Sequence, residues 1–247
     1  MSETTTRPRY HLLDELRGLV IILMVVYHAF YLLAFVFDSQ AGQTLYDFAR
    51  PVQPFIAGTF FFLCGACCRF SRSNLKRGLR LLGAAALVTL ATLAMTLFGV
   101  NEVIWFGALH FLACAVLLFA ALQKPLDKLL DGQSPLPLLI GFAAAFLLWR
   151  FVPLLPLTDF FPLYALGFPS ASLYSADYFP LIPFLFLFLS GTMAGIYGAQ
   201  GRFPEWFEGS RLPVLQWLGR HSLVIYLLHQ PALFAVFTVL GWAGVRW

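Results

Sequence analysis

Seven long apolar runs dominate the sequence and limit the folds that it can adopt. They cover roughly residues 18–37, 54–68, 79–98, 106–122, 136–152, 180–198 and 222–242. A membrane-spanning helix needs about 20 predominantly apolar residues. Only 11% of the residues are charged, whereas a soluble domain carries about a quarter. The sequence therefore predicts one all-α domain over residues 1–247, a polytopic membrane bundle of about seven transmembrane helices.

Basic residues lie mainly on one side of these predicted helices. With a cytoplasmic N-terminus, the inner segments contain Arg7, Arg9, Arg17, Arg69, Arg72, Lys76, Arg77, Arg80, Lys124, Lys128, Arg202, Arg211 and Arg220. The outer segments contain Arg50, Arg150 and Arg246. Because cytoplasmic loops of membrane proteins carry the excess of Lys and Arg, we expect the N-terminus inside and the C-terminus outside. The net charge of +4 then reflects membrane topology and gives no indication of a nucleic-acid partner.

The first apolar run carries an arginine and a histidine in "RGLVIILMVVYH". Arg17 and His28 are 11 residues apart, so on a helix both point the same way and lie about 16 Å apart along the axis. Ionisable groups inside a bilayer are costly and usually face the bundle interior or a wet cavity, and histidine accepts protons at neutral pH. His28 is therefore a candidate general base. A neutral histidine that only bonds a neighbouring helix explains the pattern equally well.

Two further histidines fall at a similar membrane depth. His229 lies nine residues after Arg220, or about 13 Å into the last predicted helix, and His110 enters the fourth from outside. Either could orient His28. No two of these histidines share a helix at ligand spacing, and Cys64 and Cys68 have no histidine or carboxylate within a turn. We therefore predict no metal site.

Two Arg-x2-Arg pairs follow the second apolar run, Arg69 with Arg72 and Arg77 with Arg80. Guanidinium groups bind phosphates bidentately, so these arginines are candidates for a phosphate-bearing substrate. Topology determination and binding of anionic lipids are the alternative explanation.

On the outer side, Asp38, Asp177 and the adjacent Tyr178 are candidates for positioning an acceptor or polarising a histidine; the aspartates also fit ordinary helix-end charges. The long outer connection 153–179 contains prolines and several aromatic residues. Its composition fits an ordered cap, because disordered segments are poor in aromatic residues, or an interfacial aromatic belt.

Several stretches spread over nearly the whole chain resemble the heparan-α-glucosaminide N-acetyltransferase-like family of integral-membrane acyltransferases, including its short bacterial members. They are "LDELRGLVIILMVVYH", "FIAGTFFFLCGACCRFSR", "RGLRLL", "WFGALHFLA", "DYFPLIPFLFLFLSGTMAG" and "LGRHSLVIYLLHQPALF". A wider likeness connects the chain with the acyltransferase-3 group. In that group an arginine and a histidine on the first span belong to the active site, and Arg17 and His28 match this pattern. An Arg-x2-Arg before the third span is also typical there, and Arg77 with Arg80 fits it best.

The resemblance implies acyl transfer across a bacterial inner membrane. Acetyl-CoA would be the co-substrate on the cytoplasmic side, with no permanently bound cofactor, and a carbohydrate-type or other small acceptor would arrive from outside. The inner arginines would bind the CoA phosphates while the pantetheine arm follows the face of Arg17 and His28. Two other classes remain open: a proton-coupled transporter or flippase that uses the histidines as relay groups, and a non-enzymatic membrane subunit whose polar residues hold helices together.

Overall fold

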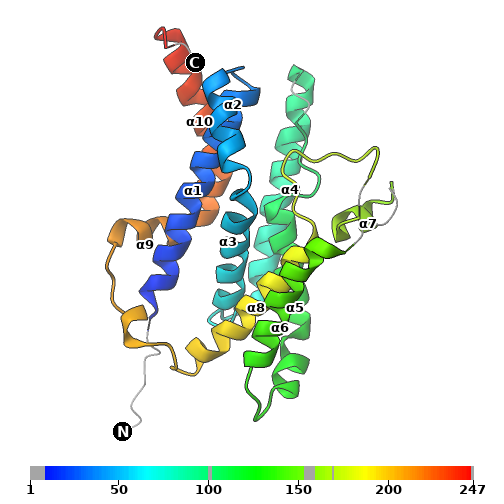
Figure 1. Cartoon of the computed structure of the whole chain (residues 1–247), viewed down its shortest axis with the longest axis vertical. Coiled ribbons are helices and arrows are strands. Elements are labelled where there is room, and N and C mark those ends of the chain that lie inside the picture. The colour runs from blue at the N-terminus through cyan, green and yellow to red at the C-terminus, as the bar shows by residue number, and fades with distance from the viewer. Residues whose placement is uncertain (1–8, 100–101, 153–158, 169, 246–247) are drawn as a thin grey trace. The chain divides into compact units, whose positions relative to one another are not determined.

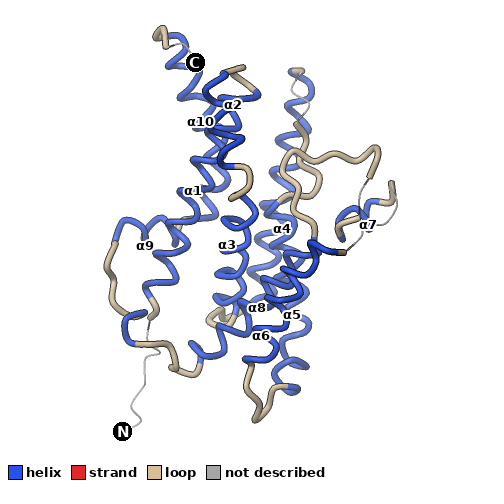
Figure 2. The backbone as a smooth tube through the Cα atoms, viewed as in Figure 1, coloured by secondary structure: helices blue, strands red, loops and turns tan. Residues whose placement is uncertain are grey.

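The computed structural model describes residues 9–99, 102–152, 159–168 and 170–245, and this part of the chain consists of helices and loops without a strand (Figures 1 and 2). The α-helices are α1 (His11–Phe35), α2 (Gln40–Ala49), α3 (Gln53–Cys68), α4 (Asn74–Met95), α5 (Ala108–Leu129), α6 (Leu136–Leu148), α7 (Phe161–Leu166), α8 (Leu181–Ala199), α9 (Pro213–Arg220) and α10 (Ser222–Trp242). Short 3-10 helices cover Thr96–Phe98, Trp149–Phe151 and Glu205–Phe207. The all-α fold class is thus confirmed.

Each of the seven predicted apolar ranges overlaps a helix. In the described residues, α1, α4, α5, α8 and α10 are long and apolar enough to span a membrane. Helices α2 and α3 qualify together, with a bend of 55° between them, and α6 is a shorter apolar helix. The structure therefore supports five or six spans; the total of seven and the orientation of the termini stay predictions. Arg7 and Arg246 of the topology prediction lie outside the described residues, as do residues 153–158 and Pro169 of the long outer connection.

The chain groups into two compact units. Unit 1 comprises Met1–Leu63 and Gly201–Trp247, and unit 2 comprises Cys64–Gln200. Unit 1 contains α1, α2, α9, α10 and most of α3, whereas unit 2 contains α4 to α8 and the last turns of α3. The predicted single domain over residues 1–247 stays a prediction.

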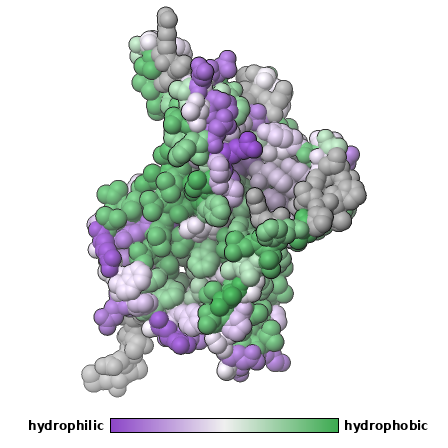
Figure 3. Space-filling model, viewed as in Figure 1, coloured by the Kyte–Doolittle hydropathy of each residue, from purple (hydrophilic) through white to green (hydrophobic). Residues whose placement is uncertain are grey.

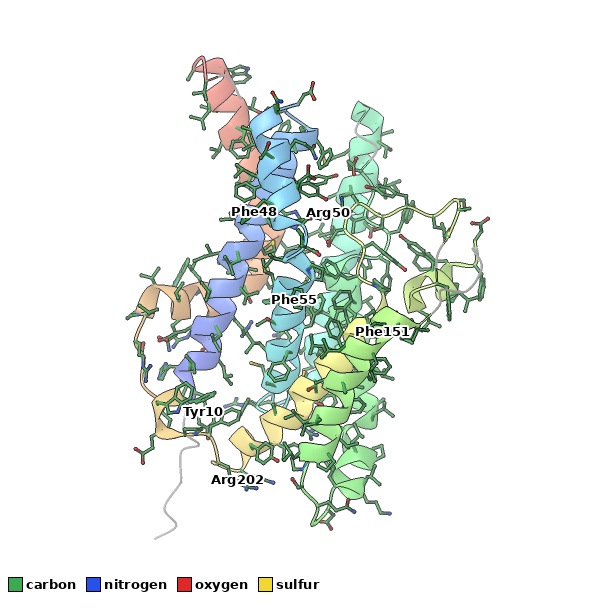
Figure 4. The ribbon with its side chains drawn as sticks, viewed as in Figure 1. Tyr10, Phe48, Arg50, Phe55, Phe151 and Arg202 are labelled. Atoms are coloured by element: carbon green, nitrogen blue, oxygen red, sulfur yellow. The ribbon has the colours of Figure 1, made fainter. Side chains whose placement is uncertain are left out.

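In unit 1, α9 packs directly against the backbone of α1. A Cβ atom added at Gly18 would lie 1.9 Å from the carbonyl oxygen of Leu215, and one added at Gly219 would lie 1.8 Å from that of Asp14. Only glycine permits so close an approach. At the start of α1, Tyr10, labelled in Figure 4, packs edge-to-face on Phe203 with ring centroids 5.0 Å apart. These contacts fix the end of α1 that carries Arg17.

The outward face of α1 is apolar along much of its length (Figure 3). Leu19, Ile22, Leu23 and Val26 are all exposed. Such a row of exposed apolar side chains is what a lipid-facing helix presents, because the bilayer and not the protein core removes them from water. The other face of α1 is therefore the one left for the polar contacts described below.

In unit 2, the end of α3 and helix α8 approach each other at two glycines. A Cβ atom at Gly65 would lie 2.1 Å from the carbonyl oxygen of Phe188, and one at Gly195 would lie 2.4 Å from that of Ala66. Small residues allow membrane helices to pack closely. Phe111, Phe119 and Phe188 are fully buried and belong to the core of the unit.

Candidate functional site

Two polar residues of α1, Arg17 and His28, face α10, and the two helices run in the same direction within unit 1. Near the start of both helices, the Arg17 guanidinium (NH2) donates to Ser222 Oγ at 2.8 Å. Further along, Gln230 Nε2 lies 2.9 Å from His28 Nδ1. Both predicted residues of the first apolar run thus contact the same neighbouring helix, as the helical periodicity requires.

His28 and His229 form a pair between α1 and α10. Their ring centroids are 4.9 Å apart, with an angle of 55° between the ring planes. His229 is buried, and its Nδ1 lies 2.6 Å from the carbonyl oxygen of Tyr226 one turn earlier. Tyr27 adds a third ring, edge-on to His28 at 5.7 Å. The structure therefore joins two of the three histidines that the sequence singled out.

Arg17 belongs to a cluster of three arginines around one carboxylate. Asp14 accepts ion pairs from Arg9, Arg17 and Arg220, at N···O distances of 3.6, 3.6 and 3.5 Å. Three positive charges against one negative charge leave a positive excess. Arg17 Nε is buried and has no hydrogen-bond partner among the described residues. This end of the α1–α10 face is thus suited to an anionic group.

His110 lies in unit 2, at the first turn of α5, within a network of its own. The backbone N–H of Gly107 donates to His110 Nδ1 at 3.2 Å, and His110 Nε2 lies 3.0 Å from Thr89 Oγ1. Thr89 donates in turn to the carbonyl oxygen of Ile104. This chain is consistent only with the proton on Nε2 of a neutral ring. The contacts tie His110 to the start of α5, next to the end of α4.

Asp177 also lies at the start of α5, where its Oδ2 accepts a hydrogen bond from the backbone N–H of Ala108 at 3.0 Å. A carboxylate at this position stabilises the helix N-terminus. The other candidate acid, Asp38, belongs to unit 1. It is exposed and has a φ angle of 49° in the turn between α1 and α2. Both aspartates therefore have a clear conformational role at a helix end.

Tyr178 is held inside the long connection before α8. Its hydroxyl donates to the carbonyl oxygen of Tyr164 at 2.6 Å, and the two rings stack with centroids 4.4 Å apart. Burial raises the pKa of Tyr164 to about 12 and also raises the pKa of Tyr178. Ser175 further bonds the backbone N–H groups of Trp105 and Phe106. The described part of this connection is therefore folded, and its role as a cap or as an interfacial aromatic belt stays a prediction.

The Arg-x2-Arg pairs each divide into one inward and one outward residue. The Arg69 side chain is only 6% exposed, donates to the Thr192 carbonyl oxygen at 3.1 Å and forms an ion pair with Asp127. Arg77 donates to Cys68 Sγ at 3.4 Å. Arg72 and Arg80 are exposed. Two of the four candidate phosphate ligands are thus engaged within unit 2, and two are open to solvent.

Several residues of the site were not predicted as such. Gln230 and Ser222, which bond His28 and Arg17, gave no signal beyond being polar residues in a mainly apolar helix. Among the described residues, no three His, Cys, Asp or Glu side chains come close enough together to hold a metal ion. The groups that meet on the α1–α10 face are therefore imidazole, amide, hydroxyl and guanidinium, which suit proton transfer and anion binding.

Comparison with known proteins identifies the family. The family model described as heparan-alpha-glucosaminide N-acetyltransferase, catalytic, matches residues 9–231. No curated protein and no solved structure matches the chain. The matched region begins just before α1 and ends at Pro231, directly after His229 and Gln230, so it includes the whole arrangement around His28. Since the match covers most of its length, this chain belongs to the heparan-alpha-glucosaminide N-acetyltransferase catalytic-domain family.

Proposed function

We propose that the chain is a membrane acyltransferase that moves an acetyl group from cytoplasmic acetyl-CoA to an extracytoplasmic, carbohydrate-type acceptor. The observation that carries the proposal is that His28 of α1 contacts His229 and Gln230 of α10, between two apolar helices. The family to which the chain belongs is named for acetyl transfer. Placing imidazoles at this depth is costly in a bilayer and is usual only where a polar path is needed. One of the two histidines acts as the general base.

Acetyl-CoA, the acetyl donor, would bind first at the positive cluster of Arg9, Arg17 and Arg220. Its unbalanced charge and the unpaired Nε of Arg17 favour binding of a phosphate of acetyl-CoA. The pantetheine arm then follows the α1 face toward His28, about 16 Å along the helix axis. The thioester carbonyl ends beside the histidine pair, where protein dipoles replace water and stabilise the developing oxyanion.

Arg72 and Arg80 are a second set of candidate phosphate ligands. Both are exposed, whereas Arg69 and Arg77 are engaged by Asp127 and Cys68. An exposed guanidinium can bind a phosphate without first breaking a contact in the protein. We therefore assign the predicted CoA-binding role of this cluster to Arg72 and Arg80, and expect neutral substitutions there to weaken acetyl-CoA binding.

The acceptor side follows from the predicted topology. With the N-terminus inside, the ends of α1 and α10 that lie beyond His28 face outward, toward a bacterial periplasm if the membrane is an inner membrane. The acceptor amine or hydroxyl would reach the histidine pair from that side.

The decisive experiment uses the full chain in proteoliposomes with [14C]acetyl-CoA as donor, and glucosamine and glucose as amine and hydroxyl acceptors. We expect label on an acceptor together with an equal amount of released CoA. We also expect His28→Ala to lower the rate about 10²–10⁴-fold, the usual contribution of acid–base groups. Equal rates in the two proteins would overturn the role of His28. Movement of acceptor without CoA release would identify a transporter instead.

A further inference from the structure

The neighbours of His28 and His229 determine which ring nitrogen of each carries the proton. In a neutral imidazole one nitrogen is a donor and the other is an acceptor, and the hydrogen bond at one nitrogen decides the role of the other. Each of the two rings has such a bond at its Nδ1 atom. The Nδ1 atom accepts the hydrogen bond in one ring and donates it in the other.

At His28, the Nδ1 atom faces the Gln230 amide nitrogen at 2.9 Å. An amide NH2 group donates hydrogen bonds and does not accept them. His28 Nδ1 is therefore the acceptor, and in the neutral ring the proton lies on Nε2. In this state His28 offers a hydrogen-bond donor to a substrate, and not a basic lone pair.

At His229, the Nδ1 atom faces the Tyr226 carbonyl oxygen at 2.6 Å. A carbonyl oxygen only accepts hydrogen bonds. His229 Nδ1 therefore carries the proton, and Nε2 of the neutral ring carries the lone pair. Because this partner is a main-chain carbonyl oxygen of the same helix, it cannot become a hydrogen-bond donor.

We propose that Gln230 is a positioning residue that keeps the proton of His28 on Nε2, so that His28 polarises the thioester carbonyl and His229 is the general base. This refines the expectation that His28 itself is the base, and it rests on the proposed acyl transfer. Gln230 and His229 are consecutive residues of α10, so one turn of helix supplies both the base and the group that orients its partner. The ring centroids lie 4.9 Å apart, so the Nε2–H donor of His28 and the Nε2 lone pair of His229 can act on one reacting centre.

The resulting step balances. His229 Nε2 takes the proton of the acceptor hydroxyl or amine while the acceptor heteroatom forms a bond to the acetyl carbon. The negative charge on the carbonyl oxygen is held by the Nε2–H of His28. As the carbonyl re-forms, the carbon–sulfur bond breaks, and the CoA sulfur takes the proton from the His229 imidazolium. The products are the acetylated acceptor and CoA thiol, with both histidines neutral again.

The test measures the tautomers directly, by NMR of 15N-histidine-labelled protein in lipid nanodiscs at pH 8. His28→Asn and His229→Asn variants assign the two signals. In the wild type we expect His28 protonated on Nε2 and His229 protonated on Nδ1. His28 protonated on Nδ1 would overturn the proposal, since the amide would then be accepting. This result is independent of turnover, so it stands even if no acetyl transfer is found.

Two variants of Gln230 extend the test. Gln230→Met keeps the length but removes the donor, so the His28 signal should lose its single tautomer while that of His229 stays unchanged. Gln230→Glu offers only an acceptor at pH 8 and should move the His28 proton to Nδ1 or charge the ring. If acetyl transfer occurs, kcat of Gln230→Glu should fall at least about 100-fold with little change in KM, because an acid–base group is in the wrong state.

Thr238→Val is the matched control on the same helix, because the Thr238 hydroxyl donates to the Phe234 carbonyl oxygen of its own helix at 2.8 Å. It should leave the tautomers and kcat unchanged. A wild-type His28 tautomer that persists in both Gln230 variants would show that Gln230 does not set it.

Discussion

Glu15 of α1 caps α9: its Oε1 accepts hydrogen bonds from the backbone N–H groups of Arg211 and Leu212 at 2.8 and 3.0 Å. Glu15 is only 4% exposed. It lies two residues before Arg17, so the contact that orders α9 also fixes the end of α1 that carries the arginine. This relationship explains a charged residue that the apolar pattern of the helix does not require.

Glu15→Ala should destabilise unit 1, because it removes the buried carboxylate that accepts two part-buried backbone hydrogen bonds, and hydrogen bonds to charged groups contribute about 1.5–3 kcal/mol. Glu15→Gln keeps an acceptor and should cost less. The check is thermal unfolding of the purified protein in nanodiscs. Glu205→Ala, at an exposed carboxylate of the same unit, is the control and should leave the melting temperature unchanged. An equal fall in the melting temperature of Glu15→Ala and Glu205→Ala would contradict the capping role of Glu15.

The close contact of α1 with α9 predicts that two glycines cannot be replaced by a larger residue without loss of stability. Gly18→Ala and Gly219→Ala would each place a methyl group under 2 Å from a backbone oxygen, so the helices must move apart. Overpacking of this kind costs about 1–3 kcal/mol or more. Gly83→Ala on α4 meets nothing within 4 Å and should instead stabilise its helix by about 0.8–1 kcal/mol. Equal melting temperatures of Gly18→Ala and Gly83→Ala would refute the packing.

The periodicity of the sequence was sufficient to predict the helices and the common face of Arg17 and His28. Apolar runs of this length can satisfy their backbone groups in a bilayer only as helices, and the 11-residue spacing then follows from helix geometry. The ranges of α8 and α10 differ from prediction by no more than one residue at either end. The bend of 55° between α2 and α3 was not predicted, because hydropathy does not encode direction.

Partners from distant parts of the chain could not be predicted. Arg69 and Arg72 look alike in the sequence, and only the position of Asp127 on α5 gives Arg69 an ion-pair partner, whereas Arg72 stays exposed. Gln230 becomes relevant only because α10 lies against α1 at the level of His28. Such pairings depend on tertiary packing, which the local pattern leaves open.

The buried position of Arg69 predicts a structural effect of its removal. Arg69→Ala deletes its bonds to Asp127 and the Thr192 carbonyl oxygen and its stacking on the Phe119 ring at 4.9 Å. Hydrogen bonds of charged groups contribute about 1.5–3 kcal/mol, so the melting temperature should fall clearly. Arg72→Ala should leave stability unchanged but weaken binding of acetyl-CoA, measured by isothermal titration. The reverse outcome would exchange the roles of the two arginines.

The connection before α8 should respond to acid through Asp159. Hydrogen bonds from Ser172 and Ser170 lower the pKa of Asp159 in the folded loop. Stabilisation by this group is therefore present above the ordinary Asp pKa of about 3.9 and is lost as the pH falls through the lower folded value. The Ser172 amide NMR signal should titrate with a midpoint below 3.9. In Asp159→Asn the titration should vanish; a midpoint at or above 3.9 would contradict the hydrogen-bonded loop.

If His28 and His229 act on one reacting centre, their losses should not add. Groups that act as a unit are grossly non-additive, because removing one already abolishes the shared step. His28→Gln and His229→Gln should each lower kcat about 10²–10⁴-fold, and the double variant should be little slower than the slower single variant. His221→Gln is the control, because His221 is exposed and bonds the Trp217 carbonyl oxygen of the preceding turn. Multiplicative losses in the double variant would show that the two rings work in separate steps, and the shared centre between α1 and α10 would have to be abandoned.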